Sequence, residues 1–97
     1  MSFIQARTSD VETRSVEDQL VLLDLRNQTY LSLNRTGAEL WPLMVEGVHR
    51  DRLVEALRER HALEPSVAER DVDALVHQLR EADLLQPEGN GGASDAR

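Results

Sequence analysis

Residues 19–41, QLVLLDLRNQTYLSLNRTGAELW, determine the fold that we expect for this chain. The apolar run Gln19–Leu25 and the alternating run Thr29–Leu33 predict two strands, joined by a polar connection at 26–28. A helix is predicted to follow. The strand Thr29–Leu33 is expected at the edge of a small sheet, where unpaired backbone N–H and C=O groups are open to another chain. This pattern favours a protein that binds an extended peptide over an enzyme.

The composition indicates one small acidic domain. The chain has 97 residues, a net charge of −7 and no cysteine. The lack of cysteine excludes a disulfide framework, a thiol nucleophile and a thiolate metal site, and it is compatible with a reducing, cytoplasmic compartment. No apolar run approaches the ~20 residues of a membrane span. We therefore expect neither a membrane partner nor a cofactor.

The expected fold class is α+β, with a three-stranded antiparallel sheet followed by three helices. Residues 11–16 (VETRSV) supply the first strand, ahead of the two strands described above. We place the packed domain at residues 11–86. A weakly ordered N-terminus is expected at 1–10, and a disordered, glycine-rich tail at 87–97.

Local signals bound the first helix. Asn34 is a good N-cap, and Thr36-x-x-Glu39 is an alternative capping box. Pro42 is predicted to kink the helix, and Gly47 is a natural C-cap. Trp41 lies on the apolar stripe of this helix and is expected in the core.

Two further helices are predicted. The second spans about 50–61, and the third is expected to open at the capping box Ser66–Glu69 and to stop near Leu84-Leu85. The apolar residues of the third helix repeat at helical spacing: Val72, Leu75, Val76, Leu79 and Ala82.

Metal and catalytic sites are not indicated. His49, His61 and His77 are 12 and 16 residues apart and have no thiolate to help them bind a metal. Asp71 and Asp73 lie on different faces of the predicted helix, because residues i and i+2 do not meet. We interpret these acids as a solvated face.

A DNA-binding regulator is the main alternative, because two helices beside a sheet resemble a winged helix-turn-helix. Residues 64–84, however, hold six acidic and two basic side chains, a net charge of −4. A major-groove reader needs basic and amide side chains at the base edges. We therefore expect no nucleic-acid partner; a generic interaction adaptor stays open as a third reading.

A set of short runs resembles a known family. The runs are Leu22–Leu25, Thr29–Asn34, Gly37–Trp41, Glu46-Gly47 and Asp71-Val72, with Leu75, Leu79 and Leu84-Leu85. In this order and spacing, the chain from Leu22 to Leu85 is similar to the PqqD-like family, also called RiPP recognition elements. Pro42 departs from the family's plain helix former, and His49 departs from its usual Ser or Thr cap.

The resemblance implies a winged helix-turn-helix-like fold that binds the leader segment of a ribosomally synthesised precursor peptide. The leader would pair with the edge of the third strand and lie against the third helix. A free-standing acidic chain of this length most resembles the leader-binding protein of lasso-peptide pathways. There, the resemblance implies, a separate cysteine peptidase removes the leader and a cyclase follows.

β-Augmentation by a leader is therefore the predicted binding mode. The predicted binding residues are Thr29, Tyr30, Leu31, Ser32 and Leu33 on the strand, Val72, Val76 and Leu79 for apolar leader side chains, and Asp73 and Arg80 at the rim. The sequence leaves open which strand face lines the groove. A proline at Leu31 is predicted to remove a strand donor and abolish binding. The acidic helix favours a leader with basic residues.

Overall fold

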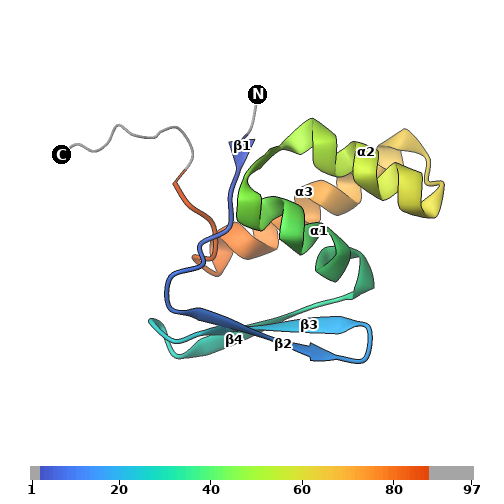
Figure 1. The fold of residues 1–97 in the computed structure, drawn as a ribbon. Coiled ribbons are helices and arrows are strands. Elements are labelled where there is room, and N and C mark those ends of the chain that lie inside the picture. Colours follow the sequence, from blue (N-terminus) through green and yellow to red (C-terminus); the bar gives the residue numbers. More distant parts are fainter. Residues whose placement is uncertain (1–2, 88–97) are drawn as a thin grey trace.

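The sheet of the computed structural model, which describes residues 3–87, has the three predicted strands (Figure 1). They are β2 (Val11–Val16), β3 (Gln19–Asp24) and β4 (Thr29–Leu33), antiparallel in the order β2-β3-β4. Glu17 and Gln28 take positive φ angles of 58° in the two connections and so allow the chain to reverse tightly. The predicted α+β class and the three-stranded sheet are confirmed.

Helix α1 (Arg35–Glu46) follows β4 directly. Of the two predicted caps, Asn34 is the one used: its side-chain oxygen accepts a hydrogen bond from Gly37 N–H at 3.0 Å. The helix continues through Pro42 to Glu46, and Gly47 ends it with a φ of 97°.

Helices α2 (Arg50–His61) and α3 (Pro65–Glu81) complete the predicted set. The capping box predicted at Ser66 is wrong, because Glu64 is the N-cap and Pro65 takes the first helical position, where no N–H is needed. The end of α3 at Glu81 is earlier than predicted, since Asp83 has a φ of 62° and reverses the chain.

The three helices cover one face of the sheet, and the core lies between the two layers (Figure 1). The side chains of Leu22 and Leu33 point inward from the sheet, and each is exposed by 1 % or less. Trp41 is 7 % exposed, which confirms its predicted place in the core. Because β-strand side chains alternate in direction, Tyr30 and Ser32 lie on the opposite, uncovered face.

Residues 3–10, which the sequence pattern places outside the packed domain, contribute to the core. Strand β1 (Phe3–Ile4) pairs with β5 (Val48–His49), and Ile4 and Ala6 are each 2 % exposed. Ala6 also bridges to Leu85. A two-residue strand has no measurable period, so the sequence pattern gave no sign of this segment. The predicted tail at 87–97 lies outside the described residues, apart from Pro87.

Candidate functional site

The open edge of β4 is the first element of the site. Within residues 3–87, β4 pairs with β3 and with no other strand. Leu25 N–H, at the end of β3, donates to Asp10 C=O, at the start of β2. Backbone groups alternate in direction along a strand, so positions 29, 31 and 33 of β4 point toward β3. Tyr30 and Ser32 therefore direct their N–H and C=O groups toward the open edge.

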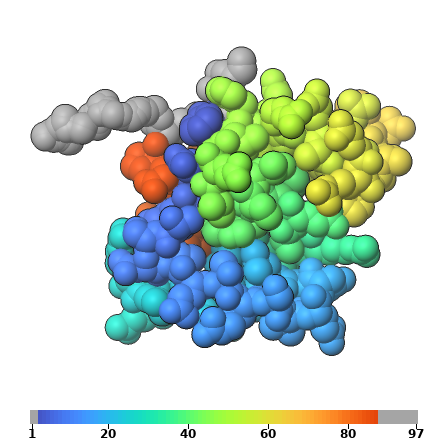
Figure 2. Space-filling model, viewed as in Figure 1, coloured from blue at the N-terminus to red at the C-terminus, as the bar shows by residue number. Residues whose placement is uncertain are grey.

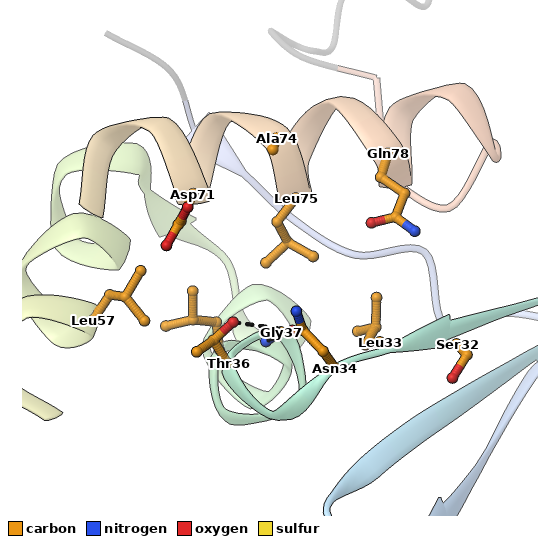
Figure 3. A pocket seen from close by; sticks show the side chains of 11 residues that line it. Ser32, Leu33, Asn34, Thr36, Gly37, Leu57, Asp71, Ala74, Leu75 and Gln78 are labelled. Atoms are coloured by element: carbon orange, nitrogen blue, oxygen red, sulfur yellow. Dashed lines mark hydrogen bonds between the residues drawn. The ribbon is translucent and has the colours of Figure 1, made fainter. Parts of the chain in front are cut away.

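A cavity of about 290 Å³ lies between the end of β4, the start of α1 and one side of α3 (Figure 3). Leu33, Leu57 and Leu75 are among its apolar lining residues, and Ser32 and Gln78 are among the polar ones. The full lining is Ser32, Leu33, Asn34, Thr36, Gly37, Leu40, Leu57, Asp71, Ala74, Leu75 and Gln78.

Gly37 keeps the walls of this cavity close together. A Cβ atom at this position would lie 3.2 Å from Leu33 Cβ and 3.3 Å from Leu75 Cδ1. Even an alanine here would require Leu33 or Leu75 to shift by a few tenths of an ångström.

A second hollow, of about 380 Å³, lies at the other end of β4. It is lined by Asn27, Thr29, Tyr30, Glu81, Ala82 and Asp83. Both hollows have a wall on β4 and a wall on α3 or the residues directly after it. We call these two hollows, which lie beside β4 at its two ends, the β4–α3 groove.

Four of the five predicted strand residues line this groove, and the fifth, Leu31, does not. The structure also gives the direction of their side chains. Leu33 is buried and Leu31 packs against the core, whereas Tyr30 is 73 % exposed. The inward face of β4 is therefore the one that meets α3, a point that the sequence left open.

The predicted helix residues lie elsewhere, and this part of the prediction is corrected. Val72 and Leu79 are 0 % exposed and Val76 is 8 % exposed, so all three are core residues. The groove is lined instead by the adjacent stripe of α3: Asp71, Ala74, Leu75 and Gln78. The sequence prediction selected the most apolar stripe of the helix, and that stripe packs inside the domain.

The two predicted rim residues also lie away from the groove lining. The carboxylate of Asp73 accepts two hydrogen bonds from Arg50, at 2.6 and 3.0 Å, and these lower the pKa of Asp73. Arg80 borders a different hollow, beside Arg7 and Arg26. Asp71 and Gln78 form a polar stripe on α3, and this stripe was the sequence signal that could have identified the polar side of the groove.

The comparisons with known proteins cover this site. The family model described as "Coenzyme PQQ synthesis protein D (PqqD)" matches residues 19–85, more than half of the 97 residues. The chain belongs to the PqqD family. The matched region spans β3, β4 and the three helices and therefore both walls of the groove. A comparison with curated protein sequences finds no match.

Two solved structures resemble the whole PqqD fold described above. "Lasso peptide synthetase B1 complexed with the leader peptide" is 29 % identical, with a TM-score of 0.73, over 88 % of this chain and 98 % of that one. "TbiB1 in Complex with the TbiA(beta) Leader Peptide" is 27 % identical, with a TM-score of 0.72, over 88 % and 96 % of the two chains. Both proteins are described with a leader peptide bound.

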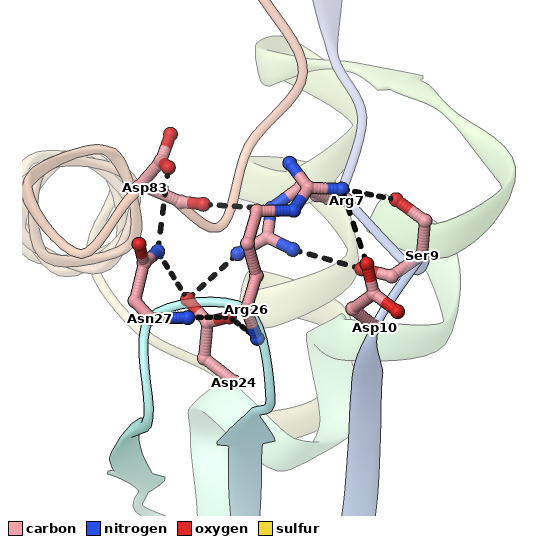
Figure 4. A network of polar contacts seen from close by, with 7 residues as sticks. All are labelled: Arg7, Ser9, Asp10, Asp24, Arg26, Asn27 and Asp83. Atoms are coloured by element: carbon pink, nitrogen blue, oxygen red, sulfur yellow. Dashed lines mark hydrogen bonds and ion pairs between the residues drawn. The ribbon is translucent and has the colours of Figure 1, made fainter.

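A buried polar network at one end of the groove includes residues outside the PqqD match (Figure 4). The Arg7 guanidinium donates to Asp24 Oδ2 at 2.7 Å and to Asp83 C=O at 2.9 Å. Asn27 Nδ2 donates to the same Asp24 oxygen at 2.8 Å. Arg7 is 5 % exposed and Asp24 is 2 % exposed. The network fixes the β3–β4 connection against the end of α3. These two segments line the second hollow of the groove, so the network also positions its walls.

The ionisation of Asp24 depends on this network. Burial disfavours the charged carboxylate, but the hydrogen bonds from Arg7 and Asn27 outweigh burial and lower the pKa of Asp24 to about 2. Asp24 Oδ1 also accepts from the backbone N–H groups of Arg26 and Asn27, at 3.1 and 3.2 Å. The carboxylate is therefore charged throughout the neutral range.

Acid is expected to destabilise the protein as Asp24 gains a proton. Its folded-state pKa of about 2 lies below the usual 3.8, so the stabilisation is complete above pH ~4 and is lost as the pH falls toward about 2. The shift corresponds to about 2 kcal/mol. Urea unfolding at pH 7 and pH 2.5 measures the loss, and Asp24→Asn is the control. Equal acid-induced losses in both proteins would contradict this assignment.

Two of the three histidines contact a neighbouring side chain. His61 Nε2 lies 2.8 Å from Glu39 Oε1, and this hydrogen bond lowers the pKa of Glu39. The His49 ring packs edge-on against Phe3, with ring centroids 5.2 Å apart. Over residues 3–87, no group of three His, Cys, Asp or Glu side chains is placed to hold a metal ion. None of the helices within residues 3–87 combines the length and the apolar character that a membrane span requires.

Proposed function

We propose that this PqqD-family protein binds the leader segment of a ribosomally synthesised precursor peptide, which adds as a strand to β4. The observation that carries the proposal is the open edge of β4 beside the β4–α3 groove. The two similar structures described with leader peptides support the choice of ligand. An added strand satisfies backbone groups that an edge otherwise leaves to water.

The backbone of Tyr30 and Ser32 would supply the strand pairing, because these two residues point to the open edge. Leader side chains on the inward face would then enter the groove, where Leu33 and Leu75 are among the lining residues. Specificity in this mode comes from such pockets, whereas the main-chain hydrogen bonds tolerate many sequences.

The charge of the groove favours a leader with basic residues. Asp71 lies at one hollow, and Glu81 and Asp83 lie at the other. Binding to exposed charges of this kind weakens as salt rises, because ions screen the attraction. We therefore propose that the leader contacts the strand residues Thr29–Leu33 and the α3 residues that line the groove. Val72, Val76 and Leu79 pack in the core instead.

The pathway that we propose is lasso-peptide maturation, on the likeness to the lasso peptide synthetase B1 structure. In this role the protein is a non-catalytic binding module. It would present the leader to a separate cysteine peptidase, with a cyclase as a further partner. A winged-helix DNA regulator is the alternative, and the negative charge of α3 opposes it.

Fluorescence anisotropy with a labelled leader from the precursor gene nearest to this one tests the proposal. We expect saturable binding at micromolar or tighter affinity, lost when the leader is scrambled. Random duplex DNA is titrated in parallel. Salt-sensitive DNA binding without leader binding would favour the DNA-binding regulator. If neither the leader nor the DNA binds, the generic interaction adaptor is the reading that remains.

Filling the groove is expected to weaken leader binding without unfolding the protein. Ala74 is exposed and lines the cavity beside Leu33 and Leu75, so Ala74→Trp places an indole where a leader side chain would lie. We expect about a tenfold loss of affinity, in line with other cases of overpacking. His77→Trp is the matched control, because His77 is exposed on α3 but absent from the groove lining. Equal affinities for the two variants would contradict this placement of the leader.

A further inference from the structure

The sheet has a second open edge, at β2. Within residues 3–87, β2 pairs with β3 alone, and five of its six residues are exposed. Figure 2 shows this strand at the molecular surface, below the helical layer and uncovered by it. An uncovered edge of this length is a template for pairing with another strand.

The backbone of β2 offers its hydrogen-bonding groups at every second residue. Because Asp10 C=O accepts from Leu25, the even-numbered residues of β2 point toward β3 and the odd-numbered ones point outward. Val11 N–H is already used by Thr8 C=O, at 3.3 Å. Thr13 and Ser15 therefore present both backbone groups at the open edge.

The charges on β2 are self-complementary. Glu12 and Arg14 flank Thr13, and their side chains are 52 % and 62 % exposed. We propose that two copies of this protein pair through antiparallel β2 strands, about a two-fold axis at Thr13. Each Thr13 would exchange two backbone hydrogen bonds with the partner's Thr13. Glu12 would then lie directly opposite the partner's Arg14, and Arg14 opposite the partner's Glu12.

Charge selects this register over its neighbours. The two adjacent registers that also match outward-pointing backbone groups are centred on Glu12 or on Arg14. Each of them places like charges directly opposite one another, which destabilises a strand pair. The register centred on Thr13 replaces that repulsion with two attractive pairs, so it is the favoured one.

Pairing through β4 instead of β2 is disfavoured. It would bring two α3 helices side by side, and residues 64–84 carry a net charge of −4 in each copy. Pairing through β2 keeps the two α3 helices apart. It would join two sheets in the order β4-β3-β2-β2-β3-β4 and leave both β4–α3 grooves at the outer ends. Self-association and groove occupancy are therefore independent.

The interface is a single strand pair, far smaller than a standard protein interface, so the dimer is weak. We expect a dissociation constant on the order of 100 μM at ~0.15 M salt, where the repulsion between two acidic chains is screened. Sedimentation equilibrium of the full chain, up to about 1 mM, would show the mass rising from 10.9 kDa toward twice that value. A wild-type protein that stays monomeric at about 1 mM overturns the proposal.

Charge reversal tests the register. Glu12→Arg and Arg14→Glu each place like charges opposite one another, and each is expected to raise the dissociation constant about tenfold or more. The double variant Glu12→Arg/Arg14→Glu restores two attractive pairs and should dimerise like the wild type. A mixture of the two single variants should form a heterodimer. Single variants that dimerise like the wild type would refute this register.

Proline variants distinguish the two edges of the sheet. Thr13→Pro removes an outward N–H without breaking the β2–β3 ladder, and it should abolish the dimer. Ser32→Pro alters the β4 edge and should leave the dimer unchanged. If Ser32→Pro dissolves the dimer and Thr13→Pro does not, the contact lies at β4 and the proposal fails.

Discussion

Replacing Arg7 with methionine is expected to lower the free energy of unfolding by about 3–5 kcal/mol, the usual cost of leaving one member of a buried ion pair without its partner. The variant removes the 2.7 Å hydrogen bond to Asp24 and the 2.9 Å bond to Asp83 C=O. Asp24 would then keep a charge at 2 % exposure, supported mainly by Asn27. Small domains have only about 5–15 kcal/mol of stability in total, so this loss is severe.

Urea unfolding followed by Trp41 fluorescence measures the effect, because the indole is 7 % exposed and reports on the core. Asp24→Asn completes a double-mutant cycle, since it removes the charge and keeps an oxygen for the backbone N–H groups of Arg26 and Asn27. We expect the double variant to be more stable than Arg7→Met alone. Arg50→Met is the control for a surface pair, with a cost below about 1 kcal/mol. Similar losses for Arg7→Met and Arg50→Met would contradict the special role of the buried pair.

The contacts of the buried network have no local signal in the sequence, unlike the strands and helices. The three strands and three helices were predicted because each carries a local period and its own turn or cap residues, such as Asn34 and Gly47. Arg7 and Asp83 are 76 positions apart, and neither has a local pattern that announces a buried contact. Long-range polar pairs of this kind become visible only when the fold brings the segments together.

For a related reason, the sequence predicted the β4 side of the groove but not the α3 side. Strand alternation placed Leu31 and Leu33 on one face, and packing against the helices then decided that this face is the inner one. On α3 the apolar stripe identifies the core and leaves the neighbouring stripe to the groove. A binding rim of mixed character, such as Asp71, Ala74 and Gln78, has no apolar signal of its own. The position of this rim depends on how α3 is rotated about its axis relative to the sheet.

The direction of the β4 backbone changes which proline variant tests leader binding. Leu31 points its N–H toward β3, opposite Leu22, so Leu31→Pro would break the internal ladder and is expected to unfold the sheet. Ser32 points its N–H to the open edge, where proline is tolerated in a strand. The variant predicted from sequence is therefore replaced by Ser32→Pro.

Ser32→Pro is expected to lower leader affinity at least about 100-fold, or about 2.7 kcal/mol, while the protein stays folded. The ring removes a donor that the leader would use, and it blocks the close approach of an added strand. Anisotropy titration measures the affinity, and urea unfolding checks the fold. Ser32→Ala is the matched control: it loses the exposed side-chain contact with Gln19 but keeps the backbone N–H, so its affinity should stay within about twofold of wild type. A folded Ser32→Pro protein that binds leader as tightly as wild type would contradict strand addition at Ser32, because the proposed pairing uses that N–H.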